Sequence, residues 1–388
     1  MGGNGVWHAR SCDGRNRGSL MLTTRYPSWT YTAALASLPL ITPLRLRRLL
    51  SLGDASRVWE MLQAGERPLV GITNDVWRAW HGVSASHVVQ IAESCIDHSM
   101  TVVSVRDAAY PSMLLGDPDA PAVLFMMGDA RVLSRRRVGI IGTRSATQRG
   151  KFFARQLGEE LAMNDICVVS GLARGIDVEA HVGAMAISRD VGCGPAAVVA
   201  SGLDVVYPPE HKRIWGEVGR RGLLISESPP GTAPQPHRFP MRNRVLAALS
   251  EVLIVVESRA AGGSMITVRE AMKRDITVMA VPGFPGVPPS EGTNNLLHDG
   301  CPPVTDVGDV LVALGLDTRG MVPTFEKRIT PHETERHLLA VMGRAPHSLE
   351  EIALLSGNTV VQTAVHLGRL EALGWVANSG GWWEALIT

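Results

Sequence analysis

The stretch that most constrains this chain runs from residue 138 to residue 184, VGIIGTRSATQRGKFFARQLGEELAMNDICVVSGLARGIDVEAHVGA. A short apolar run ends at Gly142, and large apolar residues then recur at helical spacing before a second apolar run at 166–169. Another glycine turn, at 170–177, opens a second helix. The pattern predicts a βαβ unit whose parallel strands bring both glycine turns to the edge of a sheet where ligands gather.

Further apolar runs extend this unit into a sheet. They lie at 196–200, 222–225, 252–256 and 277–281, and nearly every residue in them is apolar, as in strands covered on both faces. Two shorter runs, around 101–105 and 122–127, precede the βαβ unit and are expected to lead into the main sheet. Because helical segments alternate with the runs, the sequence predicts an α/β fold with an extended Rossmann-like, doubly wound parallel sheet.

The chain has 388 residues, which is more than one ordinary core needs, so two or three domains are expected. Its beginning is rich in Gly, Arg, Ser and Asn and lacks periodicity, which is typical of disorder. Three helical patterns followed by a hairpin indicate a winged helix at the other end. The predicted parts are a disordered segment at 1–28, a small helical domain at 29–100, the Rossmann-like domain at 101–315, a linker at 316–331 and the winged helix at 332–388.

Neither flanking domain is rich in phosphate-binding groups. The segment LPLITPLRLRRLL has the outline of a helix-hairpin-helix, but Leu40 and Thr42 stand where that motif usually has glycine. A helical domain for packing or dimerisation is therefore favoured over DNA binding. The third helix of the winged module offers Arg369 and His366 against Glu371, which favours protein contact or self-interaction over DNA readout.

Composition excludes several classes of protein. The net charge is only +1, so a phosphate-binding surface must come from a local cluster of cations. No apolar run approaches the roughly 20 residues that a bilayer span requires, so a membrane protein is not expected. The five cysteines form no CxxC pair, which predicts a reducing, cytoplasmic location and no zinc site.

The first glycine turn contains Gly142, Thr143 and Arg144 but not the further glycines of GxGxxG. No acidic residue closes the second strand, where a nicotinamide ribose is normally held, so no dinucleotide cofactor is predicted. A glycine turn with an arginine at its tip instead suits a phosphate, which accepts from backbone N–H groups and from the guanidinium fork.

The second glycine turn is of the same kind and contributes Ser170, Gly171 and Arg174. Asp177 and His181 lie four residues apart on the helix that follows, as in a metal pair, but no third ligand is spaced to complete a site. We therefore predict no metal, and expect Asp177 to cap its helix or to hold Arg174, with His181 as a structural residue.

The most informative basic stretch is PHRFPMRNR, at 236–244. Cations that follow a backbone and a ring that stacks on a base are the components of a groove for single-stranded nucleic acid, although Phe239 could instead be a buried anchor. The turn containing Gly263 and Ser264 adds small donors at the same edge. The chain shows no nucleophile elbow and no P-loop lysine, so no catalytic residue is predicted. The binding candidates from the basic stretch are His237, Arg238, Phe239, Arg242, Asn243 and Arg244.

Several motifs, in this order, are similar to those of the DNA-processing protein A (Smf) family. They are VGIIGTR, VVSGLARGIDVEAH, VVASGLDVVYPPEH, LISESPPGTAPQPHRFPMRNRVLAALS, VVES, GGSMIT and AVPG followed by EGTNNLLHDG. The resemblance spans about residues 100–305. The chain departs from the family at 146–150, which lacks the usual Ser-x-Tyr-Gly, and at Pro236, where some members place a DNA-contacting lysine.

The resemblance implies a protein without known catalysis that binds and protects single-stranded DNA, dimerises and loads the recombinase RecA during natural transformation. By position, Arg144 resembles the family's DNA-contacting arginine and Phe239 its base-stacking aromatic. The alternative is a Rossmann-type enzyme that releases bases from nucleoside monophosphates. That group is expected to carry PGGxGT near a catalytic Glu, whereas this chain has PGFPG at 282–286.

Overall fold

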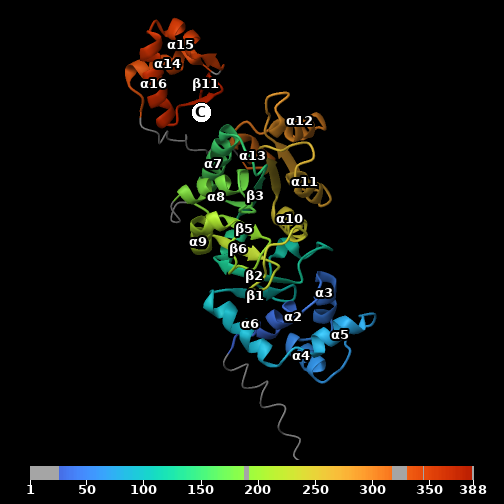
Figure 1. The fold of residues 1–388 in the computed structure, drawn as a ribbon. Coiled ribbons are helices and arrows are strands. Elements are labelled where there is room, and N and C mark those ends of the chain that lie inside the picture. The colour runs from blue at the N-terminus through green and yellow to red at the C-terminus, as the bar shows by residue number, and fades with distance from the viewer. Residues whose placement is uncertain (1–25, 188–191, 317–329, 344, 387–388) are drawn as a thin grey trace, which may run out of the picture. The chain divides into compact units, whose positions relative to one another are not determined.

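The computed structural model describes residues 26–187, 192–316, 330–343 and 345–386. They belong to two compact units that divide between residues 318 and 319 (Figure 1). The larger unit contains an eight-stranded sheet in the order β1-β2-β6-β5-β4-β3-β7-β8. The strands are β1 (Thr101–Ser104), β2 (Val123–Gly128), β3 (Arg136–Ile141), β4 (Ile166–Ser170), β5 (Ala196–Val199), β6 (Leu223–Ser226), β7 (Val252–Val255) and β8 (Thr277–Ala280).

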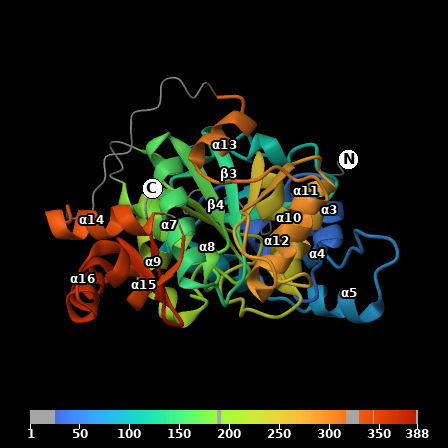
Figure 2. The same ribbon diagram turned by 90° about the horizontal axis from the view of Figure 1, so that it is seen from above.

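Helices cover both faces of this sheet, which confirms the predicted doubly wound α/β fold. Figure 2 shows α7 (Gln148–Met163), α8 (Ile176–Ala186) and α9 (Lys212–Arg221) on one side of the strands. The other side carries α10 (Arg238–Leu249), α11 (Ser264–Met272) and α12 (Glu291–His298). A final helix of this unit, α13 (Val307–Ala313), packs against α7.

The six strands from β3 to β8 pair in parallel, and the two that precede them pair antiparallel. In β4 to β7 every residue is buried, because helices cover both faces. The strand β2 lies antiparallel to β6, with Phe125 opposite Ser226, and β1 lies antiparallel to β2. The runs near 101 and 122 therefore join the main sheet, as the sequence predicts.

Residues 26–100 form five short helices that pack on the sheet through a shared hydrophobic core. Leu35, Leu49 and Trp80 belong to the same buried cluster as Phe125 and Trp215 of the α/β part. The helices are α2 (Thr30–Ala36), α3 (Pro43–Ser51), α4 (Ala55–Gln63), α5 (Asn74–His81) and α6 (Ser86–Asp97).

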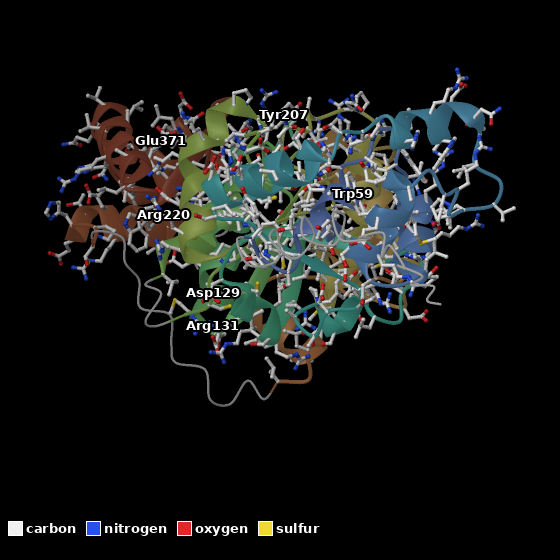
Figure 3. The ribbon with its side chains drawn as sticks, turned by 90° about the horizontal axis from the view of Figure 1, so that it is seen from below. Trp59, Asp129, Arg131, Tyr207, Arg220 and Glu371 are labelled. Carbon is white, nitrogen blue, oxygen red and sulfur yellow. The ribbon has the colours of Figure 1, made fainter. Side chains whose placement is uncertain are left out.

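Ring stacking and a hydrogen bond tie further parts of this helical region together. In α4, Trp59 (labelled in Figure 3) stacks on the His87 ring with centroids 6.2 Å apart. Most of the segment predicted as disordered, residues 1–25, lies outside the described residues. Tyr26, near its end, donates a hydrogen bond to Glu93 at 2.9 Å.

The smaller unit has the element order of a winged helix. It consists of α14 (Glu333–Met342), β9 (His347–Ser348), α15 (Leu349–Ser356), α16 (Val360–Ala372), β10 (Val376–Ser379) and β11 (Trp382–Ala385). The short strand β9 pairs with β11 and was not part of the sequence prediction. In α16, Arg369 Nε lies 3.3 Å from the buried Glu335 carboxylate, so this cation of the third helix already has a partner. Nowhere in the described ranges does a helix combine the length and the apolar character needed to cross a membrane.

Candidate nucleic-acid interface

A crevice opens where the winding of the parallel sheet changes direction. From β3 the chain continues through β4, β5 and β6 on one side, and it returns on the other side of β3 with β7. The loops after β3 and β7 therefore diverge above the carboxyl ends of the strands, the usual ligand position in such sheets. A cavity of about 380 Å³ lies there between these loops and the start of α10. Its lining includes Gly142, Thr143, Arg144, Phe239, Arg242, Asn243, Arg259, Gly263 and Ser264.

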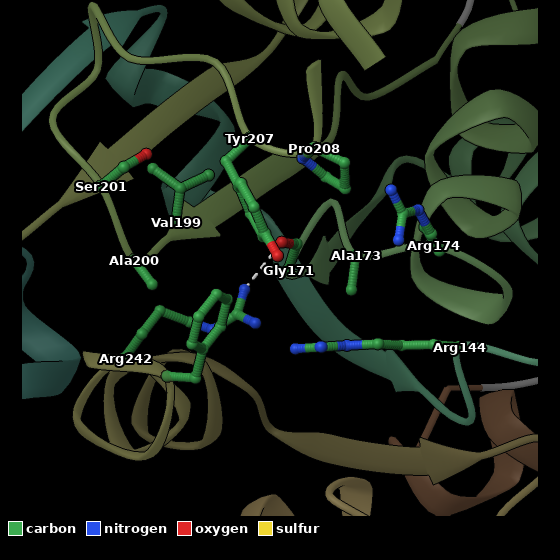
Figure 4. Close-up of a pocket in the computed structure, with 11 residues that line it drawn as sticks. Arg144, Gly171, Ala173, Arg174, Val199, Ala200, Ser201, Tyr207, Pro208 and Arg242 are labelled. Carbon is green, nitrogen blue, oxygen red and sulfur yellow. Dashed lines mark hydrogen bonds between the residues drawn. The ribbon is translucent and has the colours of Figure 1, made fainter. Parts of the chain in front are cut away.

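Two aromatic rings, Phe239 and Tyr207, and the exposed Arg144 line a small adjoining cavity, in which Figure 4 labels Tyr207 and Arg144. The guanidinium carbon of Arg144 lies 5.1 Å from the centre of the Phe239 ring, a cation–π contact. The Phe239 and Tyr207 rings have centroids 5.7 Å apart and planes tilted by 58°. Because Phe239 is only half-buried and lines both cavities, it is placed as a wall of the crevice and not as a core anchor.

The N-terminus of α7, where a Rossmann protein would hold a nucleotide phosphate, is occupied by a carboxylate of the chain itself. Glu257, after β7, accepts hydrogen bonds from the backbone N–H of Thr147 at 2.9 Å and from its hydroxyl at 2.5 Å. A Cβ added at Gly150 would lie 2.4 Å from the Glu257 carboxyl carbon, so glycine is needed for this close approach. A pyrophosphate at this position would face a negative charge, in agreement with the missing dinucleotide fingerprint.

A second carboxylate, that of Asp177, contacts the backbone of both glycine turns. Asp177 is buried and accepts hydrogen bonds from the backbone N–H groups of Gly142, Gly171 and Ala173. Burial raises the pKa of Asp177, while the charge of Arg242 and these hydrogen bonds oppose the rise. The predicted contact of Asp177 with Arg174 is wrong, because Arg174 pairs with Glu210, whereas Asp177 lies in the first turn of α8.

The two glycines contribute space rather than free donors, because Asp177 already accepts from their N–H groups. A Cβ at Gly171 would lie 1.9 Å from a guanidinium nitrogen of Arg242. Arg242 is 8% exposed and donates to the carbonyls of Gly171 at 2.7 Å and Val198 at 2.5 Å (Figure 4). Burial lowers the pKa of Arg242, and the neighbouring Asp177 carboxylate acts against it. This arginine is therefore a buried support under the crevice and does not present its charge to a ligand directly.

The other cations of the basic stretch face different directions. Arg244 donates to both carboxylate oxygens of Glu227, at 2.7 and 2.5 Å, and to the Asp119 carbonyl. It therefore holds the loop before β2 and does not line the crevice. Arg238 donates to the Ser228 hydroxyl at 3.1 Å, and the His237 side chain is exposed. Asn243 lines the crevice and accepts a hydrogen bond from Arg242 Nε at 3.0 Å.

The second glycine turn contributes one exposed cation. Arg174 lines the adjoining cavity and forms an ion pair with Glu210, at 2.5 Å, in which both side chains are about half exposed. Because such an exposed ion pair contributes little to stability, another anion can readily replace the carboxylate of Glu210 as the partner of Arg174. Ser170 is fully buried and donates to the Ile140 carbonyl at 2.6 Å, so it holds β4 to β3. Ser264, at the start of α11, donates to the Ser258 hydroxyl at 2.7 Å.

Sequence reasoning missed two residues that the structure brings to this site. Arg259 is exposed and lines the same crevice as Arg144. Tyr207, in the loop after β5, supports the Phe239 ring. A signal existed for Arg259, because it follows a predicted parallel strand by only a few residues and strand ends of this kind meet at one edge. The Tyr207 contact joins residues 32 positions apart in the sequence, and no spacing rule predicts it.

His181 is fully buried in α8, as expected for a structural residue. Burial lowers its pKa to about 3, so the ring is neutral at ordinary pH. No group of three or more His, Cys, Asp or Glu side chains suited to a metal ion occurs among the described residues.

The larger unit combines a doubly wound sheet, two antiparallel strands at one side of it, and a crevice of arginine and aromatic side chains. These features define an extended Rossmann-type protein that does not follow the dinucleotide-binding pattern. Comparison with known sequences places it more narrowly. The chain belongs to the DNA recombination-mediator protein A family, whose model matches residues 101–315.

Relatives from several bacteria support this assignment. The chain is 36% identical over 220 residues to the DNA processing protein DprA of Bacillus subtilis, which covers 56% of this chain and 72% of that protein. It is 31% identical over 275 residues to Protein Smf of Escherichia coli, covering 69% and 72%. Among solved structures, the DNA processing protein A of Streptococcus pneumoniae matches with a TM-score of 0.62 and 29% identity, covering 73% of this chain and 97% of that chain.

Proposed function

We propose that this protein binds single-stranded DNA in the crevice above β3 and β7. The observation that carries the proposal is the contact between Arg144 and the Phe239 ring, which places an exposed cation beside a half-buried aromatic ring that lines the crevice. Binding of single strands without sequence preference needs these two elements, because a guanidinium attracts the phosphate and an aromatic face stacks on a base. Arg259 in the crevice and Arg174 in the adjoining cavity supply two further exposed cations.

The remaining predicted residues take supporting roles in this proposal. Arg242 keeps the crevice floor in place and adds positive potential from below, because its charge is buried beside Asp177. The half-buried Tyr207 fixes the orientation of Phe239, which reduces the entropy lost when a base stacks on it. The absence of side chains at Gly142 and Gly171 leaves room for Ile176 and Arg242, which pack against these turns and support the crevice.

The biological role is proposed from the family. Relatives of this chain are named DNA processing proteins, and the family is described as a recombination mediator. We infer that the protein protects incoming single strands in the cytoplasm and loads the RecA recombinase onto them, acting as a homodimer. The winged unit fits a protein contact better than DNA readout, because Arg369 in its third helix is already paired with Glu335.

The alternative, a hydrolase of nucleoside monophosphates, requires a free carboxylate near the ligand. Glu257 lies at the crevice, but its oxygens accept from Thr147 at the start of α7 and hold that helix. Asp177 is buried beneath the turns and is bound by three backbone N–H groups. We therefore propose a binding protein and not an enzyme.

The proposal is tested by fluorescence anisotropy with labelled single-stranded and duplex DNA of equal length. Single strands should bind much more tightly, and Arg144→Ala and Arg259→Ala should each lower the salt slope of log K by roughly 0.7, the value for one phosphate contact. Arg269→Ala is the matched control, since Arg269 is exposed on α11 but does not line the crevice. Equal affinity for both DNA forms, or equal effects of all three substitutions, would refute the proposal.

A further inference from the structure

A second groove opens beside the crevice, between the helical region and α10. It has a volume of about 390 Å³, within the range of small-molecule sites, which is roughly 300 to 1,000 Å³. It shares Val199, Ala200 and Arg242 with the cavity that Phe239 and Tyr207 line, so the two spaces adjoin. A strand lying against Phe239 is therefore close to this groove.

The groove has apolar walls and a few polar groups at one end. One wall comes from the turn between α2 and α3, and the other comes from Met241 and Val245 of α10. The polar end holds Glu227, Ser228 and Arg238. The apolar residues contributed by the turn and by the start of α3 are Leu38, Pro39, Leu40, Ile41, Pro43 and Leu46.

Arg238 has an unused donor at this groove. Its Nη1 donates to the Ser228 hydroxyl, but its Nε is buried and has no hydrogen-bond partner among the described residues. A buried N–H without an acceptor is costly, so a ligand that offers an acceptor there is favoured. The Glu227 carboxylate lies at the same end and is largely buried, which makes the position unfavourable for a phosphate.

These features favour an uncharged ligand with apolar surfaces and a hydrogen-bond acceptor. We propose that the groove accommodates a nucleobase of the strand bound in the crevice, with a carbonyl oxygen or ring nitrogen of the base accepting from Arg238 Nε. The inference rests on the proposed single-strand binding and extends it, because it assigns a second base-binding position next to the cavity that Phe239 lines. In this arrangement Arg238 contacts a base, whereas Arg144 contacts the backbone.

The test uses the full chain and a short single-stranded oligonucleotide. Met241→Trp fills the groove and should weaken binding about five-fold to a hundred-fold, the effect of losing one bound base. Arg238→Met removes the donor and keeps the aliphatic stem. It should weaken binding while leaving the salt slope unchanged, since no phosphate contact is lost. Val312→Trp is the control for an added indole, because Val312 is 67% exposed on α13 and lines neither space.

A direct readout keeps the test independent of folding defects. Single strands that carry 5-iodouracil are photo-crosslinked to the unmodified protein, and the crosslinked peptides are mapped by mass spectrometry. Crosslinks on Met241 or on residues 38–41 support the groove. Crosslinks confined to Phe239 and Tyr207, wild-type affinity of Met241→Trp, or a salt slope lowered by Arg238→Met would each overturn it while leaving the crevice proposal intact. Failure of the unmodified protein to bind any single strand would refute the proposed function itself.

Discussion

Replacing Phe239 by alanine separates stacking from charge at the crevice. The substitution removes the ring that touches both Arg144 and Tyr207, but it removes no charge. Because stacking contributes about 1 to 3 kcal/mol per base, we expect the affinity for single strands to fall about five-fold to a hundred-fold. The salt dependence should stay the same, since the number of phosphate contacts does not change.

The same substitution has a limited cost in stability. Truncating a fully buried Phe costs about 3 to 5 kcal/mol, but Phe239 is half-buried at the rim of two cavities. It loses one aromatic pair, worth about 0.5 to 1.5 kcal/mol, and one exposed cation–π contact, worth about 0.5 to 1 kcal/mol. The free energy of unfolding should therefore fall by about 1 to 2.5 kcal/mol.

Binding curves at several salt concentrations, measured beside urea unfolding of the same preparation, give both quantities. Phe284→Ala is the control, because Phe284 is 77% exposed and lines neither the crevice nor the adjoining cavity. The reasoning is refuted if Phe239→Ala lowers the unfolding free energy as much as a core truncation, or if binding remains at the wild-type level.

Arg242→Met should act mainly on stability, because it leaves the buried carbonyls of Gly171 and Val198 without their donor. We expect urea unfolding to show a loss of about 1 to 3 kcal/mol for each carbonyl, and a stable variant with a lower salt slope would contradict this role. Glu257→Gln should lower the unfolding free energy by about 1 kcal/mol, since a charged acceptor at the start of α7 becomes neutral, and unchanged stability would argue against the cap. His181 takes up its proton near pH 3 in the folded state but near 6.5 when unfolded, so the unfolded state binds more protons between these values and stability should fall as the pH is lowered through this window. His181→Leu should flatten that part of the stability profile by up to about 1.4 kcal/mol per pH unit, and an unaltered profile would mean that other groups dominate acid unfolding.

Local pattern was sufficient for the central part of the fold. The apolar run at 138–141 and the helical spacing after it predicted β3 and α7, and the run at 166–169 predicted β4. These elements are predictable because strands buried on both faces read as continuous apolar runs. The strand β9 was missed because its two residues pair with β11, which lies more than 30 residues later in the chain.

The site was harder to predict because its polar partners come from distant parts of the chain. A cluster of three arginines at 236–244 suggested a single cationic surface. Their positions on α10 instead direct Arg242 into the core, Arg244 to Glu227 and Arg238 to the second groove. Helical spacing places Arg244 on a different side of α10 from Arg238 and Arg242, which are four residues apart and share a face. Arg238 and Arg242 differ because Arg242 donates to the buried carbonyls of Gly171 and Val198, a long-range contact that sequence spacing does not predict.

The carboxylate of Glu257 at the start of α7 has a consequence for selectivity in a cell. Free nucleotides and dinucleotide cofactors compete for Rossmann-type crevices through their phosphates, which need the helix N-terminus. Here Thr147 already donates to Glu257 at that position, so a small phosphorylated metabolite gains little there and meets a like charge. A polymer does not depend on that one position, because it gains from several weaker contacts along its length. An occupied helix terminus therefore lets the crevice discriminate against monomers of the same chemistry as its proposed ligand.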